Sequence, residues 1–341
     1  MTVRVAINGF GRIGRNFARA AWQAGSSVEI VAVNDLVPAD VHAPLLARDS
    51  THGPLRMPVR ADEQGLVVGD HRVKVLAERD PKALPWAELG IDVVMECSGV
   101  FTDGHQASAH VEAGAKRVVI SAPATNVDAT FVFGVNDDTF DPQTHVVVSN
   151  ASCTTNCFVP MVKVLDDAFG VRQGLMTTVH AYTNDQNLLD LVHKDPRRAR
   201  AAAVNVVPTS TGAARATGLV LQAMQGRLDG VSLRVPVPDG SITDLTAVLE
   251  AEVGTTEINQ AFERAAIDGR LAAVLEYTEE PIVSSDVVGS TASCLFDGSM
   301  TMALPSVGGT TLVKAFAWYD NEWGYSNRLV DVARLVSGER R

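Results

Sequence analysis

The sequence predicts two domains of different class, an α/β domain followed by an α+β domain. Two observations support this prediction. In the first 150 residues, short runs that are apolar throughout alternate with helical patterns, as in a parallel sheet covered on both faces. In the second half, the runs are longer and alternate between apolar and polar residues, which favours a mostly antiparallel sheet. A chain of 341 residues is long enough for two such domains.

The first domain is expected to span residues 1–151. Its predicted strands are apolar and rich in β-branched residues, and they lie at 3–8, 28–34, 92–97, 117–120 and 145–149. Predicted helices lie between them at 15–24, where Gly25 ends the helix, and at 106–113.

The second domain is expected to span residues 152–319. Its predicted strands are at 175–180, 231–237, 242–253 and 311–319, with a helix at 256–268. The polar, basic stretch 186–208 has no clear period and predicts a long ordered loop, a kind of segment that is usually functional or at an interface. A last helix is predicted to begin at Ser326 as its N-cap, and residues 320–341 are expected to pack back on the first domain.

The composition excludes several classes of protein. The formal charge of 29 − 40 = −11 argues against nucleic-acid binding and against binding to acidic membranes. No apolar run approaches transmembrane length, and the first residues read as a strand instead of a signal peptide. Four cysteines in a chain of this length do not form a disulfide framework. We therefore expect a cytoplasmic protein.

A glycine-rich turn between the first strand and the first helix predicts a Rossmann-type dinucleotide-binding domain. Gly9 allows the tight turn, Gly11 lets the backbone approach a pyrophosphate, and Gly14 lets helix and strand pack closely. The helix N-terminus then offers free N–H groups to the phosphates. Asp35 ends the next strand, where a carboxylate can bind ribose hydroxyls and repel a 2′-phosphate, so the expected cofactor is NAD. Arg12, beside the turn, is expected to face the anionic ligand.

A second pattern predicts a nucleophilic cysteine. Cys153 lies where a strand passes into an apolar stretch that can be helical, and a helix N-terminus lowers a thiol pKa and can hold an oxyanion. Ser152 and Thr154 add hydroxyl donors beside it. Such a nucleophile needs a base, and His180, at a strand end, is the candidate. Cys157 has no further ligands at tetrahedral spacing, so we expect no metal site.

These motifs and others closely resemble glyceraldehyde-3-phosphate dehydrogenases, in the right order over essentially the whole chain. The most specific is Ser149-Asn-Ala-Ser-Cys-Thr-Thr-Asn-Cys157. The others are Ala6-Ile-Asn-Gly-Phe-Gly-Arg-Ile-Gly-Arg15, His180-Ala-Tyr-Thr-Asn-Asp-Gln186, Arg197-Arg-Ala-Arg-Ala-Ala-Ala203, Pro208-Thr-Ser-Thr-Gly-Ala-Ala214 and Trp318-Tyr-Asp-Asn-Glu-Trp-Gly-Tyr-Ser-Asn327.

The resemblance implies a role for each matching position. Cys153 would be the nucleophile and His180 its base and later acid. Inorganic phosphate, or the transferring phosphoryl group, would contact Ser152, Thr154, Thr211 and Gly212, and the phosphate of the substrate would contact Thr183, Asp185, Arg200 and Arg234. For Arg200, an ion pair at a subunit interface is the alternative. Contacts to NAD would come from Arg12, Ile13, Asp35, Arg79, Ser121 and Asn321, the last of which would orient the nicotinamide amide.

The activity that the resemblance implies is the NAD-dependent oxidation and phosphorylation of glyceraldehyde 3-phosphate to 1,3-bisphosphoglycerate, through a thioester on Cys153. The family is usually a homotetramer, in which the loop 186–208 would lie at a subunit interface. One departure concerns this loop, where Val192 replaces a proline that helps to exclude NADP, while Asp35 still favours NAD. A second departure is Arg234-Val-Pro-Val-Pro-Asp-Gly-Ser-Ile-Thr-Asp244, which replaces a commoner Pro-Asn-Val-Ser-Val-Val-Asp form. Asp239-Gly240 is expected to change a turn there without affecting the chemistry.

Three alternatives stay open at this point. A close relative that oxidises erythrose 4-phosphate would share the cysteine and the histidine. A specialised paralogue could resist a covalent inhibitor of the housekeeping enzyme. A cofactor-binding regulatory protein that has lost catalysis would not need to keep both Cys153 and His180, so their presence argues against it.

Overall fold

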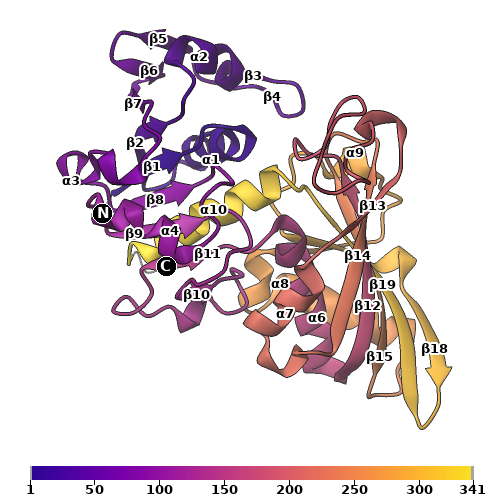
Figure 1. The fold of residues 1–341 in the computed structure, drawn as a ribbon. Helices are drawn as coiled ribbons and strands as arrows, with labels where there is room; N and C mark the ends of the chain where they lie inside the picture. Colours follow the sequence, from indigo (N-terminus) through magenta and orange to yellow (C-terminus); the bar gives the residue numbers. More distant parts are fainter. Residues whose placement is uncertain (1, 339–341) are drawn as a thin grey trace. The chain divides into compact units, whose positions relative to one another are not determined.

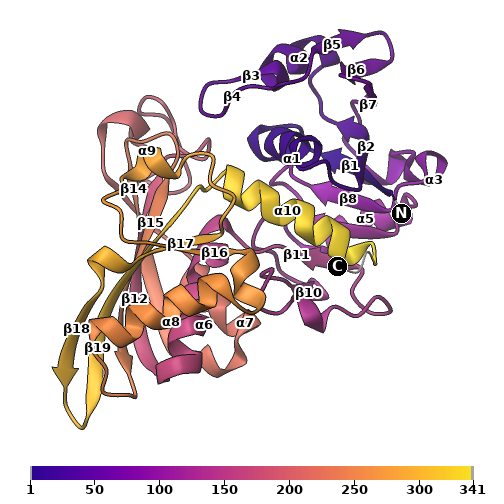
Figure 2. The ribbon, with the colours of Figure 1, turned by 180° about the vertical axis from the view of Figure 1, so that it is seen from behind.

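The computed structural model describes residues 2–338, so residues 339–341 of the helix predicted at 320–341 lie outside the described residues. The chain forms two compact units (Figures 1 and 2). The first comprises Met1–Ala151 and Ser326–Arg341, and the second comprises Ser152–Tyr325. Among the described residues, no helix is long and apolar enough to cross a membrane.

The first unit is built on a nine-stranded sheet in the order β10-β11-β9-β8-β1-β2-β7-β6-β5. Neighbours from β10 to β7 are parallel, while β7, β6 and β5 pair antiparallel. The strands are β1 (Val3–Asn8), β2 (Val28–Asn34), β5 (Val59–Asp62), β6 (Gly65–Val68), β7 (His71–Leu76), β8 (Val93–Glu96), β9 (Arg117–Ile120), β10 (Ala129–Thr130) and β11 (Val147–Ser149), with a separate pair β3 (Arg48–Asp49) and β4 (Gly53–Pro54). The parallel part confirms the predicted fold class, but the strands between residues 59 and 76 were not predicted.

The helices of the first unit cover this sheet. They are α1 (Arg12–Gln23), α2 (Ala39–Ala47), α3 (Trp86–Leu89), α4 (Gly104–Ala107) and α5 (Ala109–Glu112). One apolar cluster joins the strand side chains Ala6, Ala32 and Val94 to Trp86 and Ala107 on the helical side. The helix predicted at 106–113 is thus two short helices that meet at Ser108.

The second unit contains an eight-stranded sheet in the order β13-β14-β12-β15-β19-β17-β16, with β18 paired to β19. The pairs β12–β14 and β16–β17 are parallel, and the other neighbours are antiparallel. The strands are β12 (Val171–Ala181), β13 (Val207–Ser210), β14 (Leu228–Val235), β15 (Ser241–Leu249), β16 (Leu275–Thr278), β17 (Cys294–Asp297), β18 (Met302–Ser306) and β19 (Thr310–Tyr319). A mostly antiparallel second sheet agrees with the predicted class.

Helices lie against one face of this second sheet (Figure 2). They are α6 (Cys153–Phe169), α7 (Ala213–Val220) and α8 (Thr255–Ile267), and α9 (Ser284–Val287) is a single turn. The other side of the sheet leaves large apolar side chains such as Leu175 and Val231 exposed. The segment 186–208 is a loop apart from one short 3-10 turn at Ala202–Val204 and the start of β13, as its lack of period predicts.

The last helix, α10 (Trp323–Val336), begins earlier than predicted. Ser326 lies inside this helix and is not its N-cap. Instead, the Asp320 carboxyl accepts hydrogen bonds from the backbone N–H groups of Glu322 at 2.9 Å and Trp323 at 2.6 Å. An aspartate ahead of the first turn satisfies N–H donors that the helix itself leaves unpaired. Because Asp320 directly follows β19, the helix starts at Trp323 and not after Ser326.

Candidate active site

Cys153 is the first residue of α6, and the helix begins there because Ser152 caps it. The Ser152 hydroxyl accepts from the backbone N–H of Thr155 at 3.0 Å, which satisfies one of the free donors of the first turn. The Cys153 sulfur lies 3.4 Å from Nε2 of His180. The structure thus brings together the predicted nucleophile, on α6, and the predicted base, on β12, which are 27 positions apart in the sequence.

The neighbours of His180 determine which of its ring nitrogens carries the proton. Nδ1 lies 2.7 Å from the carbonyl oxygen of Ala181, which can only accept a hydrogen bond. We therefore assign the proton of the neutral ring to Nδ1, although Arg234 Nη1 lies 2.8 Å from the same atom. The guanidinium can donate instead to the Ala181 carbonyl, at 3.1 Å. This tautomer leaves the lone pair of Nε2 facing the thiol.

Burial favours the uncharged forms of both partners. It raises the pKa of the Cys153 thiol to about 11, against the opposing effect of Arg234. Burial, together with the positive charge of Arg234, lowers the pKa of His180 to about 3. Burial thus opposes the lowering of the thiol pKa that the helix N-terminus predicts. Both shifts favour a neutral thiol beside a neutral imidazole.

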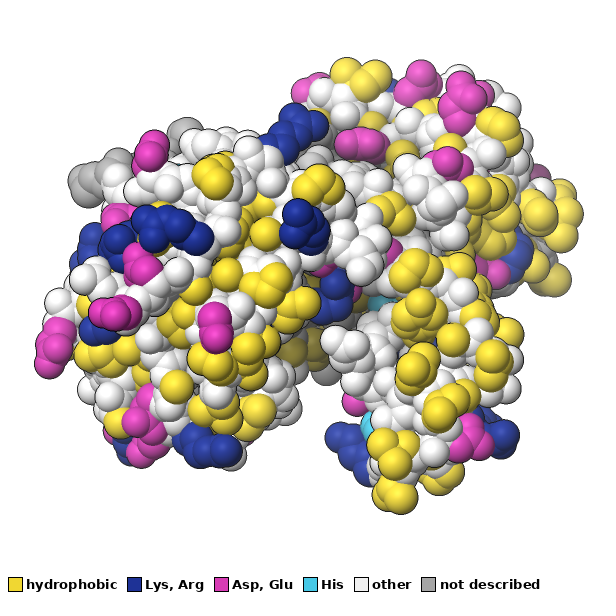
Figure 3. Space-filling model, turned by 90° about the horizontal axis from the view of Figure 1, so that it is seen from above, with side chains coloured by type: hydrophobic (Ala, Val, Ile, Leu, Met, Phe, Trp, Pro, Cys, Tyr) yellow, Lys and Arg dark blue, Asp and Glu magenta, His cyan; other side chains and the backbone are white. Residues whose placement is uncertain are grey.

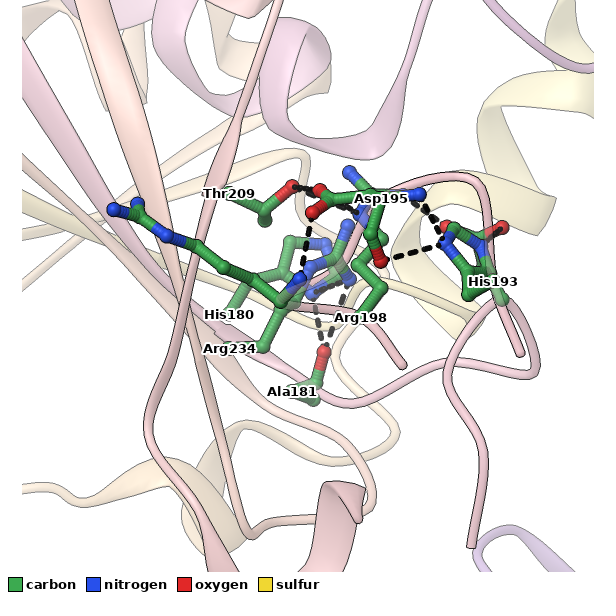
Figure 4. A network of polar contacts seen from close by, with 9 residues as sticks. His180, Ala181, His193, Asp195, Arg198, Thr209 and Arg234 are labelled. Atoms are coloured by element: carbon green, nitrogen blue, oxygen red, sulfur yellow. Dashed lines mark hydrogen bonds and ion pairs between the residues drawn. The ribbon is translucent and has the colours of Figure 1, made fainter. Parts of the chain in front are cut away.

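Two arginines, Arg234 and Arg198, belong to the polar network drawn with His180 in Figure 4. Arg234, on β14, is largely buried and contacts His180 and Ala181. Its Nε atom has no hydrogen-bond partner among residues 2–338. Arg198, from the long loop, donates to the Asp185 carboxyl and, at 2.8 Å, to the hydroxyl of Thr209. Arg198 is also paired with the carboxyl of Asp195, at 3.6 Å.

Two arginines of the loop, which the sequence does not distinguish, have different partners in the structure. Arg200, the predicted phosphate contact, is 63 % exposed in its side chain and pairs with Asp190 on the surface at 3.0 Å. Arg198 is the residue that reaches Asp185, and sequence reasoning missed it. The two lie in one basic run, Arg197-Arg-Ala-Arg, and only the path of the loop decides which side chain points inward. In this structure Arg198 contacts Asp185, whereas Arg200 pairs with Asp190.

The other predicted anion contacts are placed as follows. Gly212 precedes α7 as its N-cap, with open space where a side chain would be, and Thr211 beside it is partly buried. Thr183 is also partly buried, in the turn that follows β12. The Thr154 hydroxyl is turned inward and bonds to the Tyr319 hydroxyl at 2.8 Å, so its predicted contact with phosphate is not available to the side chain in this arrangement.

Asn321 is held by a short chain of hydrogen bonds that begins beside the base. The N–H of Ala181 donates to the Ser241 hydroxyl at 3.1 Å, and that hydroxyl donates to the side-chain oxygen of Asn321, Oδ1, at 2.6 Å. With its oxygen occupied in this way, the amide of Asn321 has a fixed orientation. Sequence reasoning predicted Asn321 but missed Ser241.

In the first unit, the glycine turn fits the backbone of a dinucleotide. A Cβ added to Gly9, which has φ +90°, would lie 2.5 Å from the backbone of Ser98. A Cβ on Gly14 would lie 2.3 Å from the Gly9 carbonyl oxygen. A Cβ on Gly11 would meet nothing within 4 Å, and Gly11 precedes α1 without any side-chain cap. The space at Gly11 and the N-terminus of α1 suit a pyrophosphate.

The remaining predicted cofactor residues lie around this turn, with one unexpected partner. Asp35 Oδ2 accepts from the Phe10 N–H at 2.7 Å, so this carboxylate also holds the turn in place. Arg12 forms a two-pronged pair with Asp49, at 2.9 and 3.1 Å, which the sequence did not suggest. Ile13 is partly buried in the first turn of α1, Arg79 is exposed after β7, and Ser121 follows β9 with its hydroxyl bonded to the Cys97 thiol.

Comparison with known proteins matches both units to one family. Residues 3–104 match the model for the NAD binding domain of glyceraldehyde 3-phosphate dehydrogenase, and residues 152–321 match the model for its C-terminal domain. The chain belongs to the glyceraldehyde-3-phosphate dehydrogenase family.

Curated relatives of this dehydrogenase family match almost the whole chain. Glyceraldehyde-3-phosphate dehydrogenase 1 of Streptomyces avermitilis is 57% identical over 336 residues, which is 98% of this chain and 99% of the relative. Glyceraldehyde-3-phosphate dehydrogenase of Streptomyces coelicolor is 56% identical over 339 residues, 99% of this chain and 100% of the relative. The first unit therefore carries the NAD binding domain of the family, and the second unit holds Cys153 and His180.

Proposed function

We propose that the protein catalyses the NAD-dependent oxidation and phosphorylation of glyceraldehyde 3-phosphate to 1,3-bisphosphoglycerate. The observation that carries this proposal is the 3.4 Å approach of the Cys153 sulfur to Nε2 of His180. A base whose free lone pair faces a thiol can take its proton as the sulfur attacks.

The residues of the second unit account for the proton transfers. His180 takes the thiol proton as the Cys153 sulfur bonds to the aldehyde carbon and passes that proton to the aldehyde oxygen, which gives a hemithioacetal. His180 then takes the hydroxyl proton as that carbon is oxidised to a thioester. Bound NAD supplies the hydride acceptor for this oxidation. An oxygen of inorganic phosphate next attacks the thioester carbon, and the Cys153 sulfur leaves as a thiolate, which a proton from His180 restores to the thiol.

Two phosphate groups must be bound in this reaction, and the candidate site offers suitable donors for both. Arg198 and Arg234 provide cationic N–H groups for the phosphate of the substrate. The Ser152 hydroxyl, Thr211 and the N-terminus of α7 after Gly212 provide donors for inorganic phosphate.

Cofactor choice rests on the first unit in this proposal. The glycine turn and the N-terminus of α1 would hold the pyrophosphate, and Asp35 would bind the adenosine ribose. A 2′-phosphate near Asp35 would meet a like charge, which favours NAD over NADP. Val192, in place of the proline of many relatives, is the one feature that favours some NADP use.

We also propose that the protein is cytoplasmic and forms a homotetramer, and the apolar side chains that the single chain leaves exposed support the association of subunits. Figure 3 shows such side chains gathered in groups on the face that it draws. In the loop that follows the site, six large apolar side chains are at least 60% exposed: Leu188, Leu189, Leu191, Val192, Val204 and Val206. Loops of this composition are usually covered by another subunit.

The deciding experiment measures initial rates of nicotinamide reduction with glyceraldehyde 3-phosphate, with and without inorganic phosphate, using NAD and then NADP. We expect fast reduction of NAD that requires phosphate, and its loss in Cys153→Ser. Faster turnover of erythrose 4-phosphate would instead assign the second aldehyde as substrate. Reduction that persists in Cys153→Ser would rule out the thioester mechanism.

A further inference from the structure

Three neighbouring strands of the first unit each end in a buried polar residue. Asn8 is the last residue of β1, Asn34 of β2 and Glu96 of β8. Asn8 is in register with Asn34 on one side and with Glu96 on the other. Polar side chains at a buried strand end are costly unless they bond to one another. These three do so, and together with His110 we call them the strand-end ladder.

The hydrogen bonds of the strand-end ladder run without a break across the sheet. Asn34 donates to the Asn8 side-chain oxygen at 2.7 Å, and Asn8 donates to Glu96 Oε2 at 2.6 Å. His110 Nε2 lies 3.0 Å from the same Glu96 oxygen. The Trp86 indole donates to His110 Nδ1 at 3.1 Å, so Nδ1 must accept and the His110 proton sits on Nε2, facing Glu96.

Each end of the ladder bonds to a loop that leaves the sheet on the cofactor side. Asn34 accepts from the Glu78 N–H at 2.8 Å and donates to the Glu78 carbonyl at 2.9 Å, which fixes the backbone just before Arg79. Glu96 Oε1 accepts from the Ser98 N–H at 2.8 Å and also bonds the Ser98 hydroxyl. Both loops are therefore tied to the same row of buried side chains.

The Ser98 loop in turn sets the position of the glycine turn. The backbone of Ser98 packs so closely on Gly9 that a single added Cβ would lie 2.5 Å from it. A shift of Ser98 must therefore move the Gly9 turn, and with it the N–H groups of the helix start that follows. The ladder thus connects three loops that are expected to contact the same ligand.

We propose that Glu96, with Asn8, Asn34 and His110, positions these loops for the adenosine and pyrophosphate half of NAD. The four residues are positioning residues, because they act through Gly9, Ser98 and Arg79 and not on the reacting atoms. The inference rests on the cofactor contacts given under the proposed function. It adds a determinant of cofactor affinity that lies in the core of the first unit.

Glu96→Gln tests the proposal because it keeps shape and removes one acceptor. Each carboxyl oxygen of Glu96 now serves two donors, so an amide NH₂ in either orientation would face two donors of the protein. The strained contacts should displace Ser98 or break the bond to Asn8. We expect the dissociation constants of NAD and of AMP, measured by calorimetry, to rise about tenfold together. The kcat at saturating NAD and the KM for inorganic phosphate should change less than twofold.

Asp92→Asn is the matched control, because Asp92 precedes the same strand β8 at its other end. Its carboxyl accepts from the Arg4 N–H at 2.9 Å and pairs with Lys116, away from the carboxyl ends of the strands. Asp92→Asn should lower stability while changing NAD affinity less than twofold.

The expected loss of NAD affinity in Glu96→Gln cannot come from the change of charge. Replacing a carboxyl by a neutral amide removes a negative charge, which by itself can only strengthen the binding of an anionic ligand.

Ser98→Ala is a second variant for the case in which Glu96→Gln does not fold. Ser98 is exposed, so folding should be intact, and loss of its hydroxyl should weaken NAD about threefold. Normal NAD and AMP affinity in a folded Glu96→Gln, or in Ser98→Ala if only that folds, would overturn the proposal. An inactive wild-type enzyme would instead contradict the proposed function, so the two failures are distinguishable.

Discussion

Asp239→Asn should stabilise the protein, and the gain should grow with pH. Asp239 is buried beside Asp320, to which it is hydrogen-bonded. Burial, followed by the charge of Asp320, raises the pKa of Asp239 from 3.8 to about 9. The folded protein therefore keeps a proton at neutral pH that the unfolded chain releases. An asparagine would donate an N–H to Asp320 without needing that proton, and its oxygen would still accept from the Gly240 N–H.

The magnitude follows from linkage. For a carboxyl whose pKa is raised on folding, stability is fully present below the unfolded pKa and falls as pH rises towards the folded pKa. The loss is roughly 1.4 kcal/mol per pH unit, which gives about 4 kcal/mol at pH 7 as an upper limit. Relaxation around two neighbouring carboxyls reduces this figure, and we expect a gain of about 2 kcal/mol for Asp239→Asn at pH 7. That corresponds to roughly 4–8 °C in Tm for a unit of this size.

The assay is unfolding of wild type and variants between pH 6 and pH 9.5. Asp268→Asn is the matched control, because Asp268 makes the same bond to a following glycine, Gly269, at 2.7 Å, but is exposed. Wild type and the control should lose stability together as pH rises, while Asp239→Asn declines less. Parallel curves for all three proteins between pH 6 and pH 9 would refute the assignment of a proton to Asp239.

Three further predictions test the proposed site residues. His180→Asn should lower kcat/KM roughly 10²–10⁴-fold with little change in NAD binding, and a loss below tenfold would contradict its role as base. Arg198→Lys should raise the KM for glyceraldehyde 3-phosphate, measured from initial rates, about tenfold, because Arg198 contacts Asp185 in the candidate site. Arg200→Lys, at the surface, should raise it less than twofold. Equal effects of the two substitutions would mean that Arg200 also binds the substrate. Asp35→Asn should raise the ratio of NADP to NAD turnover about tenfold, since the oxygen that accepts from Phe10 can remain while the repelling charge is lost. An unchanged ratio would move cofactor choice to the loop around Val192.

Local patterns in the sequence were sufficient to predict the main elements. The glycine turn requires a strand before it and a helix after it, and the structure has β1 and α1 in those places. The apolar stretch that follows Cys153 predicts a helix, which α6 confirms. These are local requirements of backbone and capping, so a single sequence contains them.

Contacts between distant residues could not be predicted in the same way. Arg12 pairs with Asp49, 37 positions later in the sequence, and Thr154 bonds to Tyr319, 165 positions later. In the basic run of the long loop, the choice of Arg198 over Arg200 depends on how the loop turns, and no residue type marks it. The early start of α10 is different in kind, because Asp320 caps this helix through local bonds to the backbone N–H groups of Glu322 and Trp323.

The two units solve one problem in the same way. A group that must be held still while a ligand comes and goes is placed on, or directly after, the last residues of a buried strand. His180 is the next-to-last residue of β12, bonded to the carbonyl of Ala181, and Asn8, Asn34 and Glu96 end their own strands. The strand fixes the backbone, and neighbouring strands supply the bonding partners that make the burial of polar atoms tolerable. The loop beyond remains free to meet the ligand, which explains why polar residues occur where strand propensity alone would not place them.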